Sequence, residues 1–373
     1  MGSEMCIRDR VKDGYSSNVS VYDSRGNIIE VVHFDSYGDP VLIKDGYASI
    51  KYIYDDSGNV IEERFFGPNG KLVINSDGYA KVNLVYDFKG NLIEVSFSGE
   101  IQEPILLEYG GYAKYNMKYD EEGNIIEVAF FGLNGEPVSY KDIFETGEYA
   151  KSKMIYDSRG NILETAYFDI ENNLTLISDG YALENKTYDS RNNIIEYAYY
   201  DENRELVDLK FSDFAKSKLV YDSYGNVIER SFYGKDGKGR TGRAGYAKWK
   251  REFDVHGNEI EKAYFGLDDK PILNKFGYFK RIQHFDAKGQ VIEQIYLGIN
   301  GELTSYRNKF QARTESVYDA RGNVSERSYF GVDGKPVLMI NGYAKFKRTY
   351  NAQNQVIEET YYDVNNNLIV PPK

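Results

Sequence analysis

The sequence predicts an all-β fold: a tandem array of about eleven antiparallel β-hairpin repeats that forms a coiled or spiralling sheet. A nine-residue phrase, YDSRGNIIE at residues 22–30, returns with small changes along the 373-residue chain. The segments around it alternate between polar and apolar residues, and the chain is rich in tyrosine (35) and phenylalanine (20), which favour strands. Each phrase also contains Asp, Gly and Asn, which are typical of tight turns.

The repeat fills almost the whole chain. Its aromatic first position occurs eleven times, and neighbouring copies are 32 or 33 residues apart except for one gap of 37. The positions are Tyr22, Tyr54, Tyr86, Tyr119, Tyr156, Tyr188, Tyr221, Phe253, Phe285, Tyr318 and Tyr350. The long gap holds an insertion near residues 140–148. We therefore expect residues 11–373 to form a single tandem-repeat β domain.

Residues 1–10 are expected to be a sequencing or cloning artefact. MCIRDR, at residues 5–10, is what a transposon end used in sequencing libraries encodes. The single cysteine, Cys6, lies in this stretch, so the sequence predicts no disulfide and no cysteine-based metal site. The true start is expected to be missing, which leaves a lost signal peptide or leading domain open.

Each copy reads as strand, turn and strand. In the third copy the strands are YAKVNLVYD (79–87) and LIEVSFSG (92–99), separated by FKGN. If FKGN is a four-residue loop, Asp87 faces Leu92 and alternate side chains share a face. One face is then apolar, with Ala80, Val82, Leu84, Tyr86, Ile93, Val95 and Phe97. A second turn, such as GVDGKP at 331–336, and a short variable stretch lead to the next copy.

A glutamate occupies the same place on the polar face of every copy. These residues are Glu30, Glu62, Glu94, Glu127, Glu164, Glu196, Glu229, Glu261, Glu293, Glu326 and Glu358. Five copies have a lysine eleven residues earlier, which predicts a diagonal surface pair within the hairpin: Lys51, Lys153, Lys218, Lys250 and Lys347. Glutamates stacked about 4.8 Å apart in a parallel solenoid would repel. Successive hairpins separate them by about 10 Å, so the hairpin array is favoured.

The turn phrases resemble a known family. YDSRGN (22–27 and 156–161) and YDARGN (318–323) resemble the YD repeats of the RHS family. That resemblance implies spiralling β-sheets on bacterial surfaces, often as shells around toxins. The RHS repeat is shorter than the period found here and lacks the GYAK and YFGxDGKP portions. No toxin or core-domain motif is present, so toxin function does not carry over.

Two weaker resemblances concern architecture and ligands. The hairpin series looks like MORN-type repeats. YFGVDGKP (329–336) is similar to aromatic–glycine cell-wall-binding repeats, whose hairpins hold choline or glycans. The ligand cages of that family rely on tryptophan, and here Trp249 is the only one.

The predicted function is a non-enzymatic repeat scaffold that binds a protein or polymer over an extended surface. The alternative is a carbohydrate- or cell-wall-binding module that uses periodic aromatic pockets. The possible binding surface is a row of aromatic residues at the hairpin exits on the polar face: Phe66, Phe131, Phe168, Tyr200, Tyr233, Phe265 and Phe330. A protein or polysaccharide partner and an extracytoplasmic or cell-surface location are favoured.

Composition and motifs argue against other classes. The net charge of -12 disfavours nucleic acid as the main partner. No apolar run is long enough to predict a membrane span. His33, His256 and His284 lie in different copies without metal-ligand spacing, and no catalytic or cofactor motif is visible. We therefore expect no catalytic residue, no cofactor and no metal.

Two loop types leave an ion open as a lesser alternative. GKDGKGRTG (234–242) is glycine-rich and basic but lacks the ending of a phosphate-binding loop, so it is expected to be an extended loop. The acidic turns Asp169–Asn173, Asp201–Glu205 and Asp363–Asn367 bring together oxygens of the kind calcium requires. Asp and Asn are also ordinary turn formers, and that interpretation is preferred.

Overall fold

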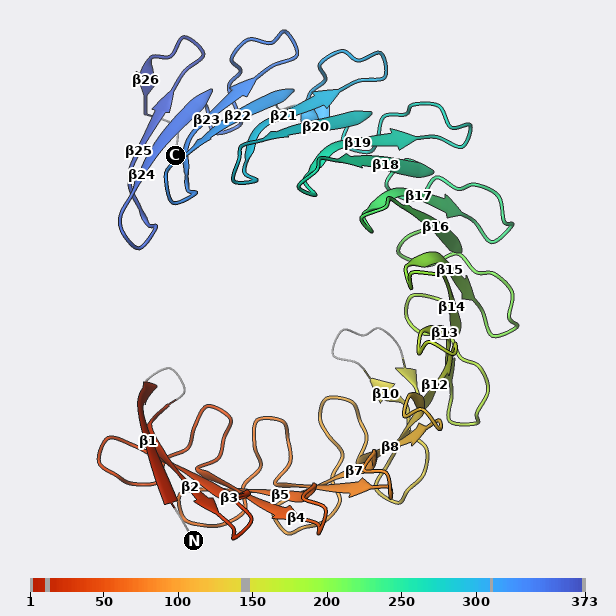
Figure 1. The fold of residues 1–373 in the computed structure, drawn as a ribbon, viewed down its shortest axis with the longest axis vertical. Helices are drawn as coiled ribbons and strands as arrows, with labels where there is room; N and C mark the ends of the chain where they lie inside the picture. The colour runs from red at the N-terminus through yellow and green to blue at the C-terminus, as the bar shows by residue number, and fades with distance from the viewer. Residues whose placement is uncertain (1–2, 11–13, 142–147, 309–310, 371–373) are drawn as a thin grey trace. The chain divides into compact units, whose positions relative to one another are not determined.

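The computed structural model describes residues 3–10, 14–141, 148–308 and 311–370, and these residues are almost entirely strands and turns (Figure 1). Their only helical element is a single 3₁₀ turn, η1 (Tyr306–Asn308). The chain divides into two compact units, one with residues 1–185 and 200–205 and the other with residues 186–199 and 206–373. The predicted all-β tandem array of antiparallel hairpins is confirmed, while the coiling of the sheet along the whole chain stays a prediction.

The first unit contains the strands of copies 1 to 5. They are β1 (Ser3–Arg10), β2 (Tyr15–Tyr22), β3 (Ile28–Phe34), β4 (Ser49–Tyr54), β5 (Val60–Phe66), β6 (Lys81–Tyr86), β7 (Leu92–Ser98), β8 (Lys114–Tyr119), β9 (Ile125–Phe131), β10 (Tyr140–Lys141), β11 (Glu148–Tyr149), β12 (Lys151–Tyr156) and β13 (Ile162–Phe168). The division between the units passes through the sixth copy, which supplies β14 (Leu183–Tyr188) and β15 (Ile194–Tyr200).

The second unit contains the strands of copies 7 to 11. They are β16 (Lys216–Tyr221), β17 (Val227–Tyr233), β18 (Lys248–Phe253), β19 (Glu259–Phe265), β20 (Lys280–Phe285), β21 (Val291–Leu297), β22 (Arg313–Tyr318), β23 (Val324–Phe330), β24 (Lys345–Tyr350), β25 (Val356–Tyr362) and β26 (Leu368–Ile369). We number the hairpins 1 to 11 by copy, so hairpin 3 is β6 and β7, and hairpin 8 is β18 and β19.

Each of the ten copies whose two strands lie in one unit forms an antiparallel hairpin. Within a unit, successive hairpins pair side by side in chain order (Figure 1). In hairpin 3, Lys81 pairs with Ser98 and Val85 with Glu94, as the sequence predicts. The body of the predicted register is therefore correct.

The predicted four-residue loop is wrong by one residue at the turn. The Asp87 amide donates to the Asn91 carbonyl at 2.9 Å, so the loop has three residues and ends at Gly90. Gly90 has φ of 86°, which a side chain disfavours. The strand then absorbs one extra residue: Tyr86 faces Leu92, not Ile93, and a bulge follows. A type I turn followed by a left-handed glycine is the common three-residue hairpin loop.

The connection between hairpins contains two more tight turns. In copy 10 the Gly331 amide donates to the Lys335 carbonyl at 2.8 Å, which confirms the predicted second turn at GVDGKP. The Met339 amide then donates to the Tyr343 carbonyl at 2.9 Å. This third turn was not predicted, because its first residues vary between copies.

The hairpins have two distinct faces. The aromatic face of each unit carries a series of buried and half-buried rings, two per copy, with successive centroids 4.6–6.3 Å apart. In hairpin 3 this face holds Val82, Val95 and Phe97, each less than 9% exposed. The opposite face, which we call the ion-pair face, carries the repeated Glu and Lys side chains. The alternation predicted from the sequence therefore separates core from charge.

A buried alanine joins consecutive hairpins. Ala80 is fully buried; its amide donates to the Ser98 carbonyl and its carbonyl accepts the Phe65 amide. The same place holds Ala48, Ala113, Ala150, Ala182, Ala215, Ala247, Ala312 and Ala344, all buried. A small residue lets the two strands approach closely, which explains the repeated GYA phrase.

Two irregular segments relate to the predicted boundaries. The backbone of β1 pairs antiparallel with β2, from Ser3 opposite Val21 to Arg10 opposite Tyr15. The artefactual origin of residues 1–10 and the single domain over 11–373 both stay predictions. The insertion stands where other copies have their third turn, and its ends form the two-residue strands β10 and β11. Residues 142–147 lie outside the described residues.

Candidate binding surface

The repeated turn phrase is explained by hydrogen bonds within the turn. In hairpin 3, Asp87 Oδ1 accepts the amides of Lys89 and Asn91 at 2.8 and 2.9 Å. Asn91 Nδ2 donates to Asp87 Oδ2 at 3.0 Å. These bonds hold the pKa of Asp87 below its usual range, chiefly through the Asn91 side chain. The Asp and Asn of YDxxGN therefore stabilise the turn.

The tyrosine of the phrase links one hairpin to the preceding one. Tyr119 Oη donates to the Leu92 carbonyl at 2.8 Å, and Tyr318 Oη donates to the Val291 carbonyl at the same distance. Equivalent bonds start from Tyr54, Tyr156, Tyr221 and Tyr350. A basic residue in the turn also reaches across, since Lys89 Nζ donates to the Glu121 carbonyl. The phrase thus serves the framework, which leaves the surfaces between the turns as candidates for function.

The repeated glutamates pair between hairpins. Each of the five lysines faces the glutamate of the preceding copy directly across the strands, and the predicted pairing within the hairpin is wrong. The distances are 3.4 Å for Glu30–Lys51, 3.7 Å for Glu127–Lys153, 3.5 Å for Glu196–Lys218, 3.2 Å for Glu229–Lys250 and 2.9 Å for Glu326–Lys347. Residues directly opposite lie about 5 Å apart, closer than a diagonal pair, which explains the choice of partner.

Open grooves occur at equivalent positions beside the turns. Each lies between neighbouring hairpins: 1 and 2, 2 and 3, 4 and 5, 6 and 7, and 8 and 9. The groove between hairpins 4 and 5 has a volume of about 1180 Å³, and the others have volumes of 510–700 Å³. Each is lined by a turn aspartate and by one isoleucine. This isoleucine is the second residue after the asparagine that ends the turn phrase: Ile29, Ile61, Ile126, Ile195 or Ile260.

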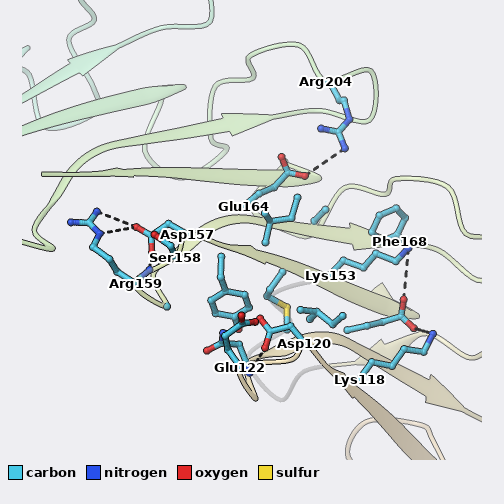
Figure 2. Close-up of a pocket in the computed structure, with 18 residues that line it drawn as sticks. Lys118, Asp120, Glu122, Lys153, Asp157, Ser158, Arg159, Glu164, Phe168 and Arg204 are labelled. Atoms are coloured by element: carbon cyan, nitrogen blue, oxygen red, sulfur yellow. Dashed lines mark hydrogen bonds and ion pairs between the residues drawn. The ribbon is translucent and has the colours of Figure 1, made fainter. Parts of the chain in front are cut away.

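Figure 2 shows the groove between hairpins 4 and 5. Lys118 and Lys153 approach Glu127 from two sides, at 2.9 and 3.7 Å. Arg204, from the segment after β15, pairs with Glu164 at 3.5 Å and extends the lining along β13. The basic groups of this groove thus each lie beside a carboxylate, and the lining offers a ligand both polar and apolar contacts.

An exposed aliphatic row accompanies the grooves. The residue before the repeated tyrosine is on the ion-pair face and is aliphatic in six copies. Val21 is half-buried, and the other five are 43–55% exposed: Ile53, Val85, Ile155, Val220 and Val317. The first four line grooves. The repeat pattern does not by itself predict this row, although an aliphatic residue at a polar-face position is a signal for it.

The predicted aromatic row lies at the hairpin exits on the ion-pair face. All seven residues are half-buried. Six have a cation above the ring, at 4.2–5.8 Å from the centroid: Phe66, Phe131, Phe168, Tyr233, Phe265 and Phe330. In these six residues a lysine or arginine therefore covers one face of the ring, the kind of face on which a sugar would stack. Phe168 also lines the groove of Figure 2, and Phe66 lines the groove between hairpins 1 and 2.

The histidines occupy unrelated places. His33 is buried between Tyr15 and Tyr47, and burial lowers its pKa. His284 Nδ1 lies 2.6 Å from Glu293, and His256 is exposed. Over residues 3–10, 14–141, 148–308 and 311–370, no group of three or more His, Cys, Asp or Glu could hold a metal ion.

The loops considered for ions use their charged groups internally. Asp201 Oδ1 accepts the Asn203 and Glu205 amides, and Asp363 Oδ1 accepts the Asn365 and Asn367 amides. In the glycine-rich loop, Arg240 pairs with Asp208 at 3.0 Å. The turn-forming interpretation of these segments accounts for the contacts found.

Comparisons with known proteins give only distant structural likenesses. No model of a protein family matches the chain, and no curated protein matches it. A crystal structure of TcdB2–TccC3–Cdc42 is 13% identical over 91% of this chain, with a TM-score of 0.31. The Photorhabdus luminescens Tc holotoxin pore is 12% identical over 93%, with a TM-score of 0.24. A porin-like protein from Bacteroides uniformis is 9% identical over 74% of this chain and 86% of its own, with a TM-score of 0.15.

The match to the toxin structures is partial in length. This chain spans 20–24% of the length of the toxin chains that it matches. The TM-scores are too low for any of these likenesses to carry an argument. Separately, the described residues include no helix with the length and apolar character needed to cross a bilayer.

Proposed function

We propose that this protein is a non-enzymatic scaffold that binds an extended protein or polymer chain along its ion-pair face. The observation that carries the proposal is the recurrence of the groove: the same kind of depression, lined by the same kinds of residue, occurs beside the turns at five junctions between neighbouring hairpins, three in the first unit and two in the second. A series of equivalent weak sites suits a ligand that is itself long, because linked contacts add avidity without strong single sites.

The lining chemistry supports a chain-like ligand. Exposed aliphatic side chains such as Ile155 and Val220 offer apolar contact, and neighbouring Lys–Glu pairs offer hydrogen bonds. The catalytic residues of an enzyme usually form one singular constellation, whereas the notable residues of this face are repeated. A carbohydrate or cell-wall ligand that stacks on the aromatic row is the alternative, and the covering cations count against it.

The test uses the full chain and two kinds of immobilised ligand: purified polysaccharides, including peptidoglycan, and a phage-displayed library of linear peptides. Ile155→Asp and Val220→Asp are introduced singly and together. Val332→Asp, at an exposed aliphatic residue of a connecting turn, is the matched control. We expect affinity for the bound ligand to fall with each groove altered and to be unchanged in the control.

The outcomes separate the hypotheses. Retention on peptides alone supports a protein partner, and retention on polysaccharide supports the polymer. Loss of polysaccharide binding in Phe168→Ala, with Ile155→Asp unaffected, would replace the proposal by the aromatic-pocket alternative. Absence of binding to every ligand, or binding that no groove substitution weakens, overturns it.

A further inference from the structure

A row of cations interrupts the aromatic face of the second unit. Arg251 in β18 faces Lys262 in β19, and Lys262 faces Arg281 in β20. In the first unit, the equivalent row of hairpin 3 consists of Leu84, Val95 and Tyr115. Directly opposed like charges destabilise a sheet, so the basic row is not explained by strand pairing.

Two cations of the row pack against the ring of Trp249. The Arg251 guanidinium is 4.2 Å from the centroid of Trp249, and Lys262 Nζ is 5.0 Å from it. Trp249 itself is buried. On the other side of the tryptophan, Arg230 faces it from β17. The cations are thus held at fixed places above apolar surface, where their charge is screened less than in open water.

The positive charge is only partly neutralised. Glu259 pairs with both Arg251 and Arg281. No carboxylate of the described residues lies within ion-pair distance of Lys262 or Arg230; the Arg230 side chain donates to Ser217 Oγ at 3.1 Å, and its Nε is buried without a hydrogen-bond partner. Four cations against one carboxylate leave an excess of three positive charges, in a chain whose net charge is -12.

From this geometry we propose that the face of hairpins 7 to 9 binds a phosphate or sulfate oxyanion between Arg251, Lys262 and Arg281. A multivalent oxyanion neutralises more of the excess than a carboxylate does, and it has enough oxygens to accept bonds from several donors. Guanidinium groups match this geometry through paired donors, and the ammonium group supplies a point charge. The Arg251 and Arg281 side chains are each 29% exposed, so both are partly open to solvent.

This inference is independent of the proposed scaffold function. The oxyanion site lies on the aromatic face, whereas the grooves are associated with the ion-pair face. The site also differs from the other described rows, because its three facing residues are all cations. Other rows hold uncharged residues, such as Leu84 and Val95, or a single cation, such as Arg327, or a cation opposite a carboxylate, as Arg348 is opposite Glu359.

The experiment measures the thermal stability and calorimetric binding of the full chain with inorganic phosphate, sulfate and glycerol phosphate. Chloride at equal ionic strength is the reference, because a specific ligand of the folded state raises the Tm beyond a general salt effect. We expect phosphate to raise the Tm of the wild type. Lys262→Met and Arg281→Gln should each weaken phosphate binding by about tenfold or more.

Lys250→Met is the control, because Lys250 lies in the same hairpin on the ion-pair face, paired with Glu229. It should respond to phosphate as the wild type does. Stronger binding of glycerol phosphate than of inorganic phosphate identifies a phosphomonoester as the ligand, and the reverse order identifies the free anion. The proposal is overturned if phosphate acts no differently from chloride, or if Lys262→Met and Arg281→Gln both keep the wild-type response.

Discussion

Hairpins 3 and 8 share a backbone register and differ in chemistry at the centre of the aromatic face. Leu84 faces Val95 in hairpin 3, and Arg251 faces Lys262 at the equivalent place in hairpin 8. Both hairpins have the bulge in the strand after the turn, and both turns are closed by an Asp–Asn hydrogen bond. The backbone therefore does not depend on what occupies the central row.

The central rows of hairpins 3 and 8 contribute differently to the free energy of unfolding. Val95 is 4% exposed, and burial of such a side chain contributes about 1.5–3 kcal/mol. Two like charges about 5 Å apart repel by about 3 kcal/mol at an effective dielectric constant near 20. A cation over Trp249 offsets this by about 0.5–2 kcal/mol. Hairpin 8 thus forgoes core stabilisation that hairpin 3 has, as expected where a surface is kept for a ligand.

The largest effect is expected when the chemistry of hairpin 8 is placed in hairpin 3. Val95→Lys introduces an unpaired charge among Val82, Phe97 and Leu107, which are all buried. We expect a loss of about 3–5 kcal/mol in the free energy of unfolding, measured by urea denaturation. Val85→Lys, one residue from the turn tyrosine and exposed on the ion-pair face, should change it by less than about 0.5 kcal/mol. A mild effect of Val95→Lys would mean that the central row of hairpin 3 is not core.

The second effect is the pH dependence of hairpin 8. The pKa of Lys262 is lowered from 10.5 to about 8. Burial is the largest cause, followed by the charge of Arg251; Arg281 also lowers the pKa, and Glu259 opposes the shift. Between these values the unfolded chain binds more protons than the folded one, so stability rises with pH; below about pH 8 both states are protonated and the full penalty applies. From pH 8 to about pH 9.5 the wild type should gain about 1.5 kcal/mol relative to Lys262→Met, measured by denaturation at each pH. Parallel curves for the two proteins would contradict this.

The sequence predicts the hairpins well because their signals are local. Asp87, Gly90 and Asn91 determine the turn among themselves, and alternation assigns the faces of β6 and β7. The predicted loop is one residue too long. A left-handed glycine at the fourth residue counted from the turn aspartate indicates a three-residue loop, and the remaining residue then forms a bulge in the following strand. That signal was present in Gly90.

Contacts between copies were predicted less well, because they depend on how one hairpin is positioned against the next. The sequence predicts that Lys51 pairs with Glu62 of its own hairpin, whereas in the structure it pairs with Glu30 of the preceding hairpin. The groove lining has the same non-local origin, since each groove lies between two hairpins. The basic row is not predicted for another reason. The repeat pattern describes what the copies share, whereas Lys262 is a residue in which one copy differs from it; a lysine on the predicted apolar face is nevertheless visible in the sequence.

The third prediction tests whether the framework is equal in both units. Tyr119→Phe in the first unit and Tyr318→Phe in the second each remove a hydroxyl that donates at 2.8 Å to a carbonyl of the preceding hairpin. Each should cost about 1 kcal/mol in the free energy of unfolding. Tyr37→Phe, at a tyrosine that is 90% exposed, should cost nothing measurable. A clear difference between the first two would show that the units differ in more than their central rows.

The smallest effect concerns the ion pairs that both units share. Double-mutant cycles with Lys→Met and Glu→Gln should give a coupling of about 0.2–1 kcal/mol for Glu30–Lys51 and for Glu229–Lys250, which are separated by 3.4 and 3.2 Å. The diagonal pair Lys250–Glu261, within one hairpin, should give a coupling near zero. Because both lysines are about half exposed, the coupling should shrink in high salt. If the diagonal pair couples as strongly as the direct ones, the glutamates act within hairpins, and the ion-pair face does not link one copy to the next.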